Sequence, residues 1–310
     1  MFRIETPGLQ STLQGAPRVG HRHFGIPYAG PADPLSMALA NRLVDNALDA
    51  TCLEIAYGGF EAAIEAAVTI AVTGAGDDVL ISGQRAPMHE SLELQAGDQL
   101  VIPPMRHGVR TYLAVASGFQ AWSHFGSCST YLPGKFGGHE GRALIAGDRL
   151  APHADALVVP KQITPETLRP HLGDTYALRA TVSAETDLLL PEALDMLFQA
   201  SFTVGRQATR MGLSLDGPMI IPHSDGMMES APVFPGTIQA PPSGHPIILL
   251  CDAQTTGGYP RVASIARCDQ HLLGQARPGD QIQLLRRSFE QALHEDRDKR
   301  ALFAAWFARD

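Results

Sequence analysis

Lysine is the scarcest charged residue in this chain. Only three lysines occur among 310 residues, Lys135, Lys161 and Lys299. None lies in a G-x-x-x-x-G-K-[ST] pattern, which excludes a Walker-type phosphate loop. None follows a methionine, as a biotin-carrier lysine usually does, so we expect no biotin attachment site in this chain.

Cysteine and long apolar runs are also scarce. Cys52, Cys128, Cys251 and Cys268 are dispersed without a C-x-x-C pair, which indicates reduced thiols. Residues 1–14 do not resemble a secretory signal, and no run approaches the roughly 18 apolar residues of a membrane helix. The net charge of -8 argues against nucleic acid as a partner. We therefore expect a cytoplasmic protein without a membrane or nucleic-acid partner.

Short apolar runs separated by turn residues dominate the first half, at the spacing of a β-barrel or sandwich. After a first strand over residues 2–6, these runs cover residues 53–57, 68–73, 79–82, 92–94, 100–102 and 112–116. Helices are expected over residues 36–44, with Asp33 or Ser36 as the cap, over residues 191–199, and from Ser288 to Phe307. The fold class is mainly β with a few helices (α+β). We place the lobes at residues 1–160 and 161–310, and exchange of segments between them stays open.

The final helix and the turns have recognisable patterns. Ser288-Phe-Glu-Gln291 fits a capping box, and Phe289, Leu293, Phe303 and Phe307 predict an apolar docking face. The tripeptides Ala96-Gly-Asp98, Ala146-Gly-Asp148 and Pro278-Gly-Asp280 each predict a tight turn that leads into a strand. The spacing Gly25-x4-Gly30-Pro31 recurs as Gly212-x4-Gly217-Pro218, which is weak evidence for two related lobes.

The stretch from Ile247 to Pro260 is the first candidate site. An apolar run over residues 247–250 predicts a buried strand, and polar residues follow it directly. Gly257-Gly258 then allows a turn that other residues would resist. The pattern is typical of a binding rim on a rigid strand, although a hairpin whose polar groups satisfy each other has the same sequence.

Three further features have both a structural and a functional interpretation. Glu54 lies inside an apolar strand, so its carboxylate must be paired or functional, and pairing is the commoner case. His21 and His23 alternate as zinc ligands sometimes do, but no third ligand lies nearby. Cys128, in the glycine-rich stretch that continues to Gly141, is either a nucleophile or a structural residue.

The motifs together resemble one protein family, known as KipA-like, allophanate hydrolase subunit 2 or biotin-dependent carboxyltransferase. They span nearly the whole chain in order: residues 25–33, 40–46, Leu53-Glu54, Thr73-Gly-Ala-Gly76, 110–116, Gly126 to Thr130, Gly141-Arg142, Arg210-Met-Gly212, Pro235 to Gln239 and Asp252 to Arg261. One departure is Tyr131, where the family commonly has aspartate, so a substrate or partner contact there would be altered.

The resemblance implies two cyclophilin-like β-barrel lobes and membership of an ATP-dependent 5-oxoprolinase complex, a hydrolase of 5-oxo-L-proline to L-glutamate. It implies a KipI-like B-type subunit and an A-type subunit as partners, with ATP as co-substrate of the complex. Two alternatives remain: a carboxyltransferase acting with biotin on urea or a similar amide, and a non-enzymatic antagonist of a kinase-inhibitor protein.

This chemistry needs bases, donors to phosphoryl oxygens and a positioned water. As catalytic residues we predict Asp252, Gln254 and Glu54. As residues that bind the substrate or phosphate we predict Arg22, Arg210, Arg261, Thr255, Thr256, Tyr259 and Asp33. No metal site is expected.

Overall fold

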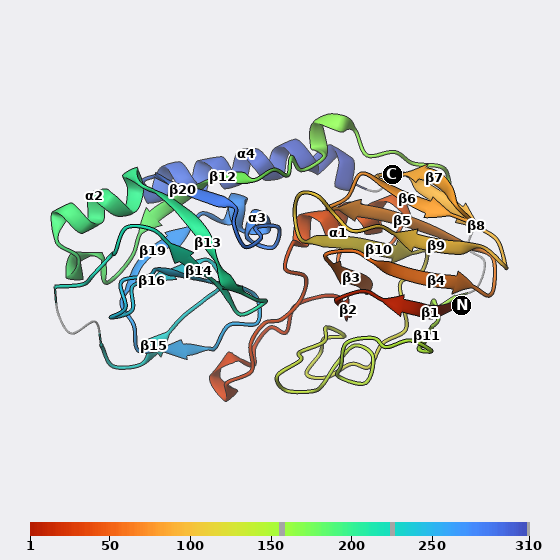
Figure 1. Cartoon of the computed structure of the whole chain (residues 1–310), viewed down its shortest axis with the longest axis horizontal. Helices are drawn as coiled ribbons and strands as arrows, with labels where there is room; N and C mark the ends of the chain where they lie inside the picture. Colours follow the sequence, from red (N-terminus) through yellow and green to blue (C-terminus); the bar gives the residue numbers. More distant parts are fainter. Residues whose placement is uncertain (155–158, 224–226, 309–310) are drawn as a thin grey trace. The chain divides into compact units, whose positions relative to one another are not determined.

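The computed structural model describes residues 1–154, 159–223 and 227–308. It divides into two compact units: residues 1–19 with 29–172, and residues 20–28 with 173–310. The second unit therefore contains a short segment from the beginning of the chain. Both units consist mainly of β-strands with a few helices, as the sequence predicted (Figure 1).

The first unit contains two antiparallel sheets. One has the strand order β11-β1-β4-β9-β6-β7 and the other has β2-β3-β10-β5-β8. Side chains from both sheets form one buried cluster, in which Phe2 meets Phe119 edge to face at 5.3 Å between ring centroids. The strands are β1 (Phe2–Pro7), β2 (Gln10–Gln14), β3 (Cys52–Ala56), β4 (Phe60–Ile64), β5 (Val68–Gly74), β6 (Asp78–Ile81), β7 (Gln84–Pro87), β8 (Ser91–Leu94), β9 (Gln99–Ile102), β10 (Arg110–Val115) and β11 (Arg149–Leu150).

Helix α1 (Pro34–Leu43) packs on β10 and β5 of the first unit. Asp33 caps it by accepting a hydrogen bond from the Ser36 N–H at 2.9 Å, as the sequence predicted. Every residue of β3 and β10 is buried. Glu54, in the middle of β3, is therefore held away from water.

The second unit is built around a closed barrel in the order β12-β19-β16-β17-β14-β13-β20, in which β12 and β20 pair in parallel. Its strands are β12 (Thr175–Val182), β13 (Ser201–Ala208), β14 (Gly212–Asp216), β16 (Thr237–Gln239), β17 (Ile247–Leu249), β19 (Arg261–Ile265) and β20 (Gln281–Arg286). A separate two-stranded sheet pairs β15 (Ala231–Pro232) with β18 (Thr256–Gly257). The other elements are helices α2 (Pro191–Gln199), α3 (Gln270–Leu273) and α4 (Phe289–Phe307), and the 3₁₀ turns η1 (Arg22–Phe24), η2 (Glu166–Leu168, in the first unit), η3 (Thr186–Leu188) and η4 (Arg267–Asp269).

Helix α4 begins at the predicted capping box, with Ser288 and Gln291 bonded reciprocally. It lies along the second unit (Figure 1) and is anchored by Phe303 and by Ala292, which packs on Ala266 and Cys268. Of the predicted apolar face, Phe303 is buried, whereas Phe289 is 71% exposed. The first turn of the helix therefore presents an aromatic ring to solvent while Ala292, on another side of the same turn, is buried.

The three predicted Gly-Asp turns share one geometry. In each turn the aspartate carboxylate accepts a hydrogen bond from the backbone N–H three residues earlier, at 2.7 to 2.9 Å: Gln95 to Asp98, Ile145 to Asp148 and Arg277 to Asp280. The preceding glycines have φ between 94° and 97°, a region that disfavours side chains. By contrast, the longer glycine echo is no structural repeat, because Gly25 follows a 3₁₀ turn whereas Gly212 begins β14.

No helix in residues 1–154, 159–223 or 227–308 is both long and apolar enough to cross a membrane.

Candidate functional site

The loop after β17 is the part of the second unit where the predicted site residues gather. Ile248 and Leu249 are buried in the barrel, as the apolar run predicted. The chain then leaves the barrel and pairs as β18 with β15, so that Thr256 lies opposite Pro232. Hydrogen bonds from Ala253 N–H to the Leu250 carbonyl (3.1 Å) and from Val233 N–H to the Thr255 carbonyl (3.1 Å) fix the loop on both sides of Gln254.

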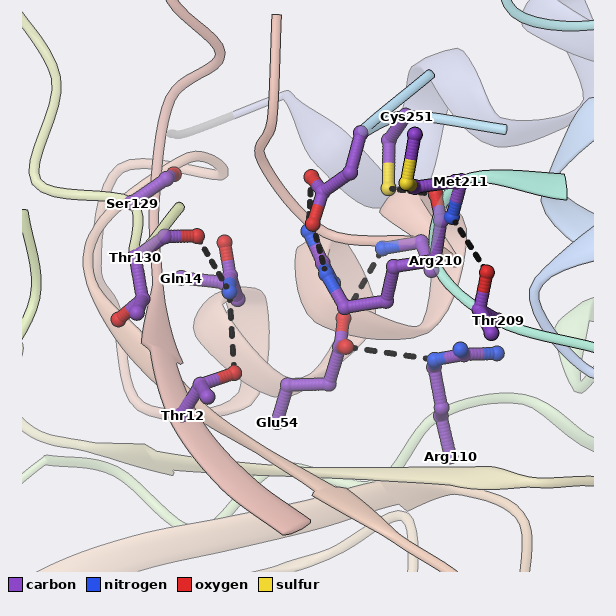
Figure 2. Close-up of polar contacts among 12 residues, drawn as sticks. Thr12, Gln14, Glu54, Arg110, Ser129, Thr130, Thr209, Arg210, Met211 and Cys251 are labelled. Carbon is purple, nitrogen blue, oxygen red and sulfur yellow. Dashed lines mark hydrogen bonds and ion pairs between the residues drawn. The ribbon is translucent and has the colours of Figure 1, made fainter. Parts of the chain in front are cut away.

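Asp252 and Arg210 form a buried ion pair that holds the start of this loop. The Arg210 Nε donates to Oδ2 at 2.8 Å and its Nη2 donates to Oδ1 at 3.0 Å, so both carboxylate oxygens are engaged. The Asp252 N–H also donates to the Arg210 carbonyl at 2.9 Å. Figure 2 shows the neighbouring contact, in which the Cys251 sulfur faces that carbonyl. A carboxylate bound in this way is suited to holding the loop in place.

Three predicted site residues leave their polar groups accessible. Gln254, Thr256 and Tyr259 are exposed, whereas Thr255 is half-buried. A Cβ at Gly257 would lie 2.7 Å from the Gln239 amide nitrogen, which donates to the Tyr259 carbonyl at 3.3 Å, so a side chain there would displace this amide. The loop thus presents an amide, a hydroxyl and a phenol on a backbone that is fixed by hydrogen bonds.

Arg22 reaches the same loop from the segment of residues 20–28. Its guanidinium lies over the Tyr28 ring at 4.7 Å and the Phe234 ring at 4.9 Å from the ring centroids. It donates to the Val233 carbonyl and to the Thr255 carbonyl, the latter at 3.4 Å. Burial lowers the pKa of Arg22, which remains a charged donor at neutral pH. These bonds to backbone carbonyls favour a role in holding the loop.

Arg261 is engaged by a carboxylate that sequence reasoning did not identify. Its Nε donates to a Glu185 oxygen at 2.6 Å, and its Nη1 donates to the Pro232 carbonyl at 2.8 Å. This hydrogen-bonded pairing lowers the pKa of Glu185 and raises that of Arg261. Arg261 therefore ties β19 to the β15–β18 sheet.

Glu54 belongs to the first unit and is paired, as the commoner interpretation predicted. One oxygen accepts from Arg110 Nε at 3.3 Å, and the other accepts from the Tyr112 hydroxyl at 2.7 Å and the Ala32 N–H at 2.9 Å (Figure 2 shows the arginine contact). Burial and the Glu54 charge raise the pKa of Tyr112 well above its usual value. The Tyr112 hydroxyl also accepts from the Asp33 N–H at 2.8 Å. The network fastens the loop before α1 to the sheet.

The glycine-rich stretch around Cys128 is hydrogen-bonded to the end of β2 and to the residues that follow it. Thr130 Oγ1 donates to the Leu13 carbonyl at 2.9 Å, and Ser129 Oγ to the Gly15 carbonyl at 3.0 Å. Figure 2 shows Gln14 bridging Thr12 and Thr130 in the same network. Cys128 is half-buried, with its sulfur 3.9 Å from the Ala121 carbonyl. Within the described ranges no group of three metal-ligating side chains occurs, around His21 and His23 or elsewhere.

In the 5-oxoprolinase complex that the sequence resemblance implies, we expect Cys128→Ser to retain most of the activity, because the loop is held by hydroxyl groups and the thiol lies beside a backbone carbonyl. Steady-state turnover relative to the wild-type chain tests this. A loss approaching the roughly 10⁴-fold cost of deleting a true nucleophile would show that the thiol is catalytic.

Comparison with known proteins places these features in a family. The model of the carboxyltransferase domain, subdomain A and B, matches residues 24–286. The chain belongs to this carboxyltransferase family. It is 34% identical to the C subunit of 5-oxoprolinase from Escherichia coli, over 99% of this chain and 98% of that protein.

Solved structures of carboxyltransferase-family relatives show the same fold. Urea amidolyase of K. lactis superposes with a TM-score of 0.90 at 26% identity, over all of this chain but only 20% of that one. The protein TTHA0988 superposes with a TM-score of 0.83 at 36% identity, over 91% of this chain. This chain spans about half the length of TTHA0988, at 55%.

The sequence predicted the polar loop after β17, but it did not predict which residues pair with the charged residues of the site. Glu185, Arg110 and Tyr112 each bind a predicted site residue. No motif distinguishes Glu185, whereas Arg110 and Tyr112 lie in the family motif of residues 110–116 but were not assigned a role. Arg210 and Asp252 lie 42 residues apart, and only their common presence in family motifs could have suggested a pair. Asp252, Arg210, Arg22, Thr255 and Arg261 all belong to the second unit, where they form separate contacts with the loop after β17 and with β15, whereas Glu54 and Asp33 belong to the first unit.

Proposed function

We propose that this chain is one component of an ATP-dependent 5-oxoprolinase complex that hydrolyses 5-oxo-L-proline to L-glutamate. The proposal rests on one observation, the 34% identity to the 5-oxoprolinase C subunit over nearly the full length of both chains. Partner subunits of the A and B type complete the enzyme. The chain alone is inactive, since it has no recognisable nucleotide motif.

A five-membered lactam is a stabilised amide, so its opening is coupled to ATP. The lactam carbonyl oxygen takes the γ-phosphoryl group and ADP leaves. Water then adds to the activated carbon, the carbon–nitrogen bond breaks, and the nitrogen takes a proton to become the amine, which leaves an acyl phosphate. A second water attacks the carbon of this acyl phosphate, so that phosphate leaves with the former carbonyl oxygen and the carboxylate of glutamate keeps one oxygen from each water. These steps need donors for phosphoryl and developing oxyanion charge, and a held water.

In this chain the accessible groups of the loop serve that purpose. Gln254, Thr256 and Tyr259 provide neutral hydrogen-bond donors and acceptors on a fixed backbone. Asp252, Arg210 and Arg22 act as positioning residues, because they hydrogen-bond to the loop and to its support. Glu54 likewise positions the segment before α1, because it accepts hydrogen bonds from the Ala32 N–H and the Tyr112 hydroxyl.

Reconstitution tests the proposed function. The purified chain with ATP and 5-oxo-L-proline is expected to release no glutamate, and addition of the A-type and B-type subunits is expected to restore turnover. Omission of this chain from the mixture, and replacement of ATP by a non-hydrolysable analogue, should each abolish glutamate release. Full activity of the other two subunits without this chain would refute the proposal.

A carboxyltransferase acting on urea or a similar amide is the second candidate, favoured by the fold similarity to urea amidolyase. Biotin would then be carried by another chain, because no lysine here follows a methionine. The same reconstituted mixture, supplied with carboxybiotin and urea in place of 5-oxo-L-proline, distinguishes the two candidates by the product formed. A chain that binds a B-type subunit but supports neither reaction would correspond to the third alternative, a regulator.

A further inference from the structure

The first unit contains a cavity of about 330 Å³ that the proposed function does not use. Its walls come from the Thr73-Gly-Ala-Gly76 motif, from Met88 and His89, from the loop around Arg106, and from residues 169–172. The volume lies at the lower end of the range for small-molecule sites. The cavity is therefore large enough for a small organic or inorganic ion with its water.

One wall of this cavity is formed by residues 169–172, at the end of the first unit. Residues 162–164 pair with residues 89–91: the Ser91 N–H donates to the Gln162 carbonyl at 3.0 Å, and the Thr164 N–H donates to the His89 carbonyl at 2.9 Å. Arg169 Nε then donates to the Thr164 carbonyl at 3.0 Å. These bonds hold the Arg169 side chain at the cavity wall.

His89 is the buried polar residue of the cavity. It is only 8% exposed, and its φ of 62° is uncommon for a residue with a side chain. Its Nδ1 has no hydrogen-bond partner in the described part of the chain. Burial, and then the charge of Arg169, lower its pKa to about 4, so the ring is neutral at pH 7. A strained, buried imidazole with unused hydrogen-bonding capacity is costly unless something binds there.

The charge of the lining is positive although the whole chain has a net charge of -8. Arg106 and Arg169 are both exposed and both line the cavity. Asp77 is the only acidic residue of the described lining, and His107 and His171 add two further imidazoles. Two guanidinium groups against one carboxylate leave an excess of at least one positive charge.

We propose that this cavity binds a small oxyanion, a carboxylate or a phosphate. Planar guanidinium groups pair with such oxyanions through two parallel hydrogen bonds, which makes arginine the residue best suited to them. The neutral His89 ring offers a further hydrogen bond inside the cavity. Gly76, with φ of 125°, keeps one wall free of a side chain, since a Cβ there would lie 3.0 Å from the Met88 sulfur. The site is independent of the proposed 5-oxoprolinase activity.

Calorimetric titration of the full chain, at constant ionic strength, tests the site with two probes. Potassium phosphate represents the phosphate source and potassium succinate represents the carboxylate source. Succinamide, which has the shape of succinate without its charge, is the neutral control. We expect saturable binding of at least one anion and none of succinamide. Whether phosphate, succinate or both bind shows whether the natural ligand is a phosphate, a carboxylate or either of them.

Variants locate the binding in the cavity. Arg169→Gln and Arg106→Ala are each expected to weaken it at least about tenfold, since each removes charged hydrogen bonds. Arg149→Ala removes an exposed arginine that does not line the cavity, and it should leave the affinity unchanged. Melting temperatures establish that each variant is folded. If only one of the two cavity variants folds, its affinity alone decides whether the anion binds in the cavity. The proposal is overturned if neither anion binds, if succinamide binds equally well, or if the folded cavity variants bind like the wild-type chain.

Discussion

Arg210→Ala is expected to lower the free energy of unfolding of the second unit by about 3–5 kcal/mol, the usual cost of removing one partner of a buried ion pair. The carboxylate of Asp252 would stay buried, and both of its oxygens would lose their arginine partner. The penalty comes from the unpaired charge more than from the lost attraction, because water cannot reach the carboxylate in the native fold.

Denaturant unfolding of the wild-type chain and of the variant measures this loss. Arg206→Ala provides a matched control, since Arg206 is an exposed arginine of β13 close to Arg210 in sequence, and it should change stability by less than about 0.5 kcal/mol. The double variant Arg210→Met with Asp252→Leu should lose less than Arg210→Ala alone, because no charge remains buried. Equal stability of Arg210→Ala and wild type would mean that the pair does not hold the loop.

Local chemistry explains which parts of the fold could be predicted. The capping box at Ser288 and the turns ending at Asp98, Asp148 and Asp280 depend on residues three positions apart, so the sequence displays the whole interaction. Apolar runs likewise indicated most strands of the first unit. The exposure of Phe289 was not predictable, because a capping box and apolar spacing do not show which residues of a helix pack against the rest of the unit.

The charged site residues show the opposite situation. The sequence shows that Asp252 and Glu54 follow or interrupt apolar strands, but not which residues face them. The partner of Asp252 lies 42 positions away, and the arginine bound to Glu54 lies 56 positions away. Both pairs arise from strand register and loop packing. Side-chain type alone therefore suggested a base, whereas the geometry favours a positioning residue.

The basic cavity is the clearest case of a feature that no local pattern indicates. His89 and Arg169 are far apart in sequence, and they meet because residues 162–164 pair beside His89. The Thr73-Gly-Ala-Gly76 motif was recognised, but its place as a wall of the cavity depends on that pairing.

Gln254→Leu is expected to reduce turnover of the reconstituted complex at least about tenfold, which corresponds to roughly 1.4 kcal/mol of transition-state stabilisation. The loop on both sides of Gln254 is already fixed by backbone hydrogen bonds and by the Asp252–Arg210 pair. Because the backbone around this amide is already ordered, little conformational entropy is lost when the amide binds the reacting group. Most of the free energy of its hydrogen bonds is then available to stabilise the transition state. Leucine has nearly the same size but neither donates nor accepts.

The melting temperature separates the functional role from a structural one. Because the Gln254 side chain is exposed, we expect the variant to unfold at the same temperature as the wild-type chain. Gln283→Leu is the matched control: Gln283 is an exposed glutamine on β20, three strands away from β17 around the barrel, and its replacement should leave turnover unchanged. If Gln254→Leu instead lowers the melting temperature while the folded enzyme turns over normally, the loop is architecture and the active groups lie elsewhere in the complex.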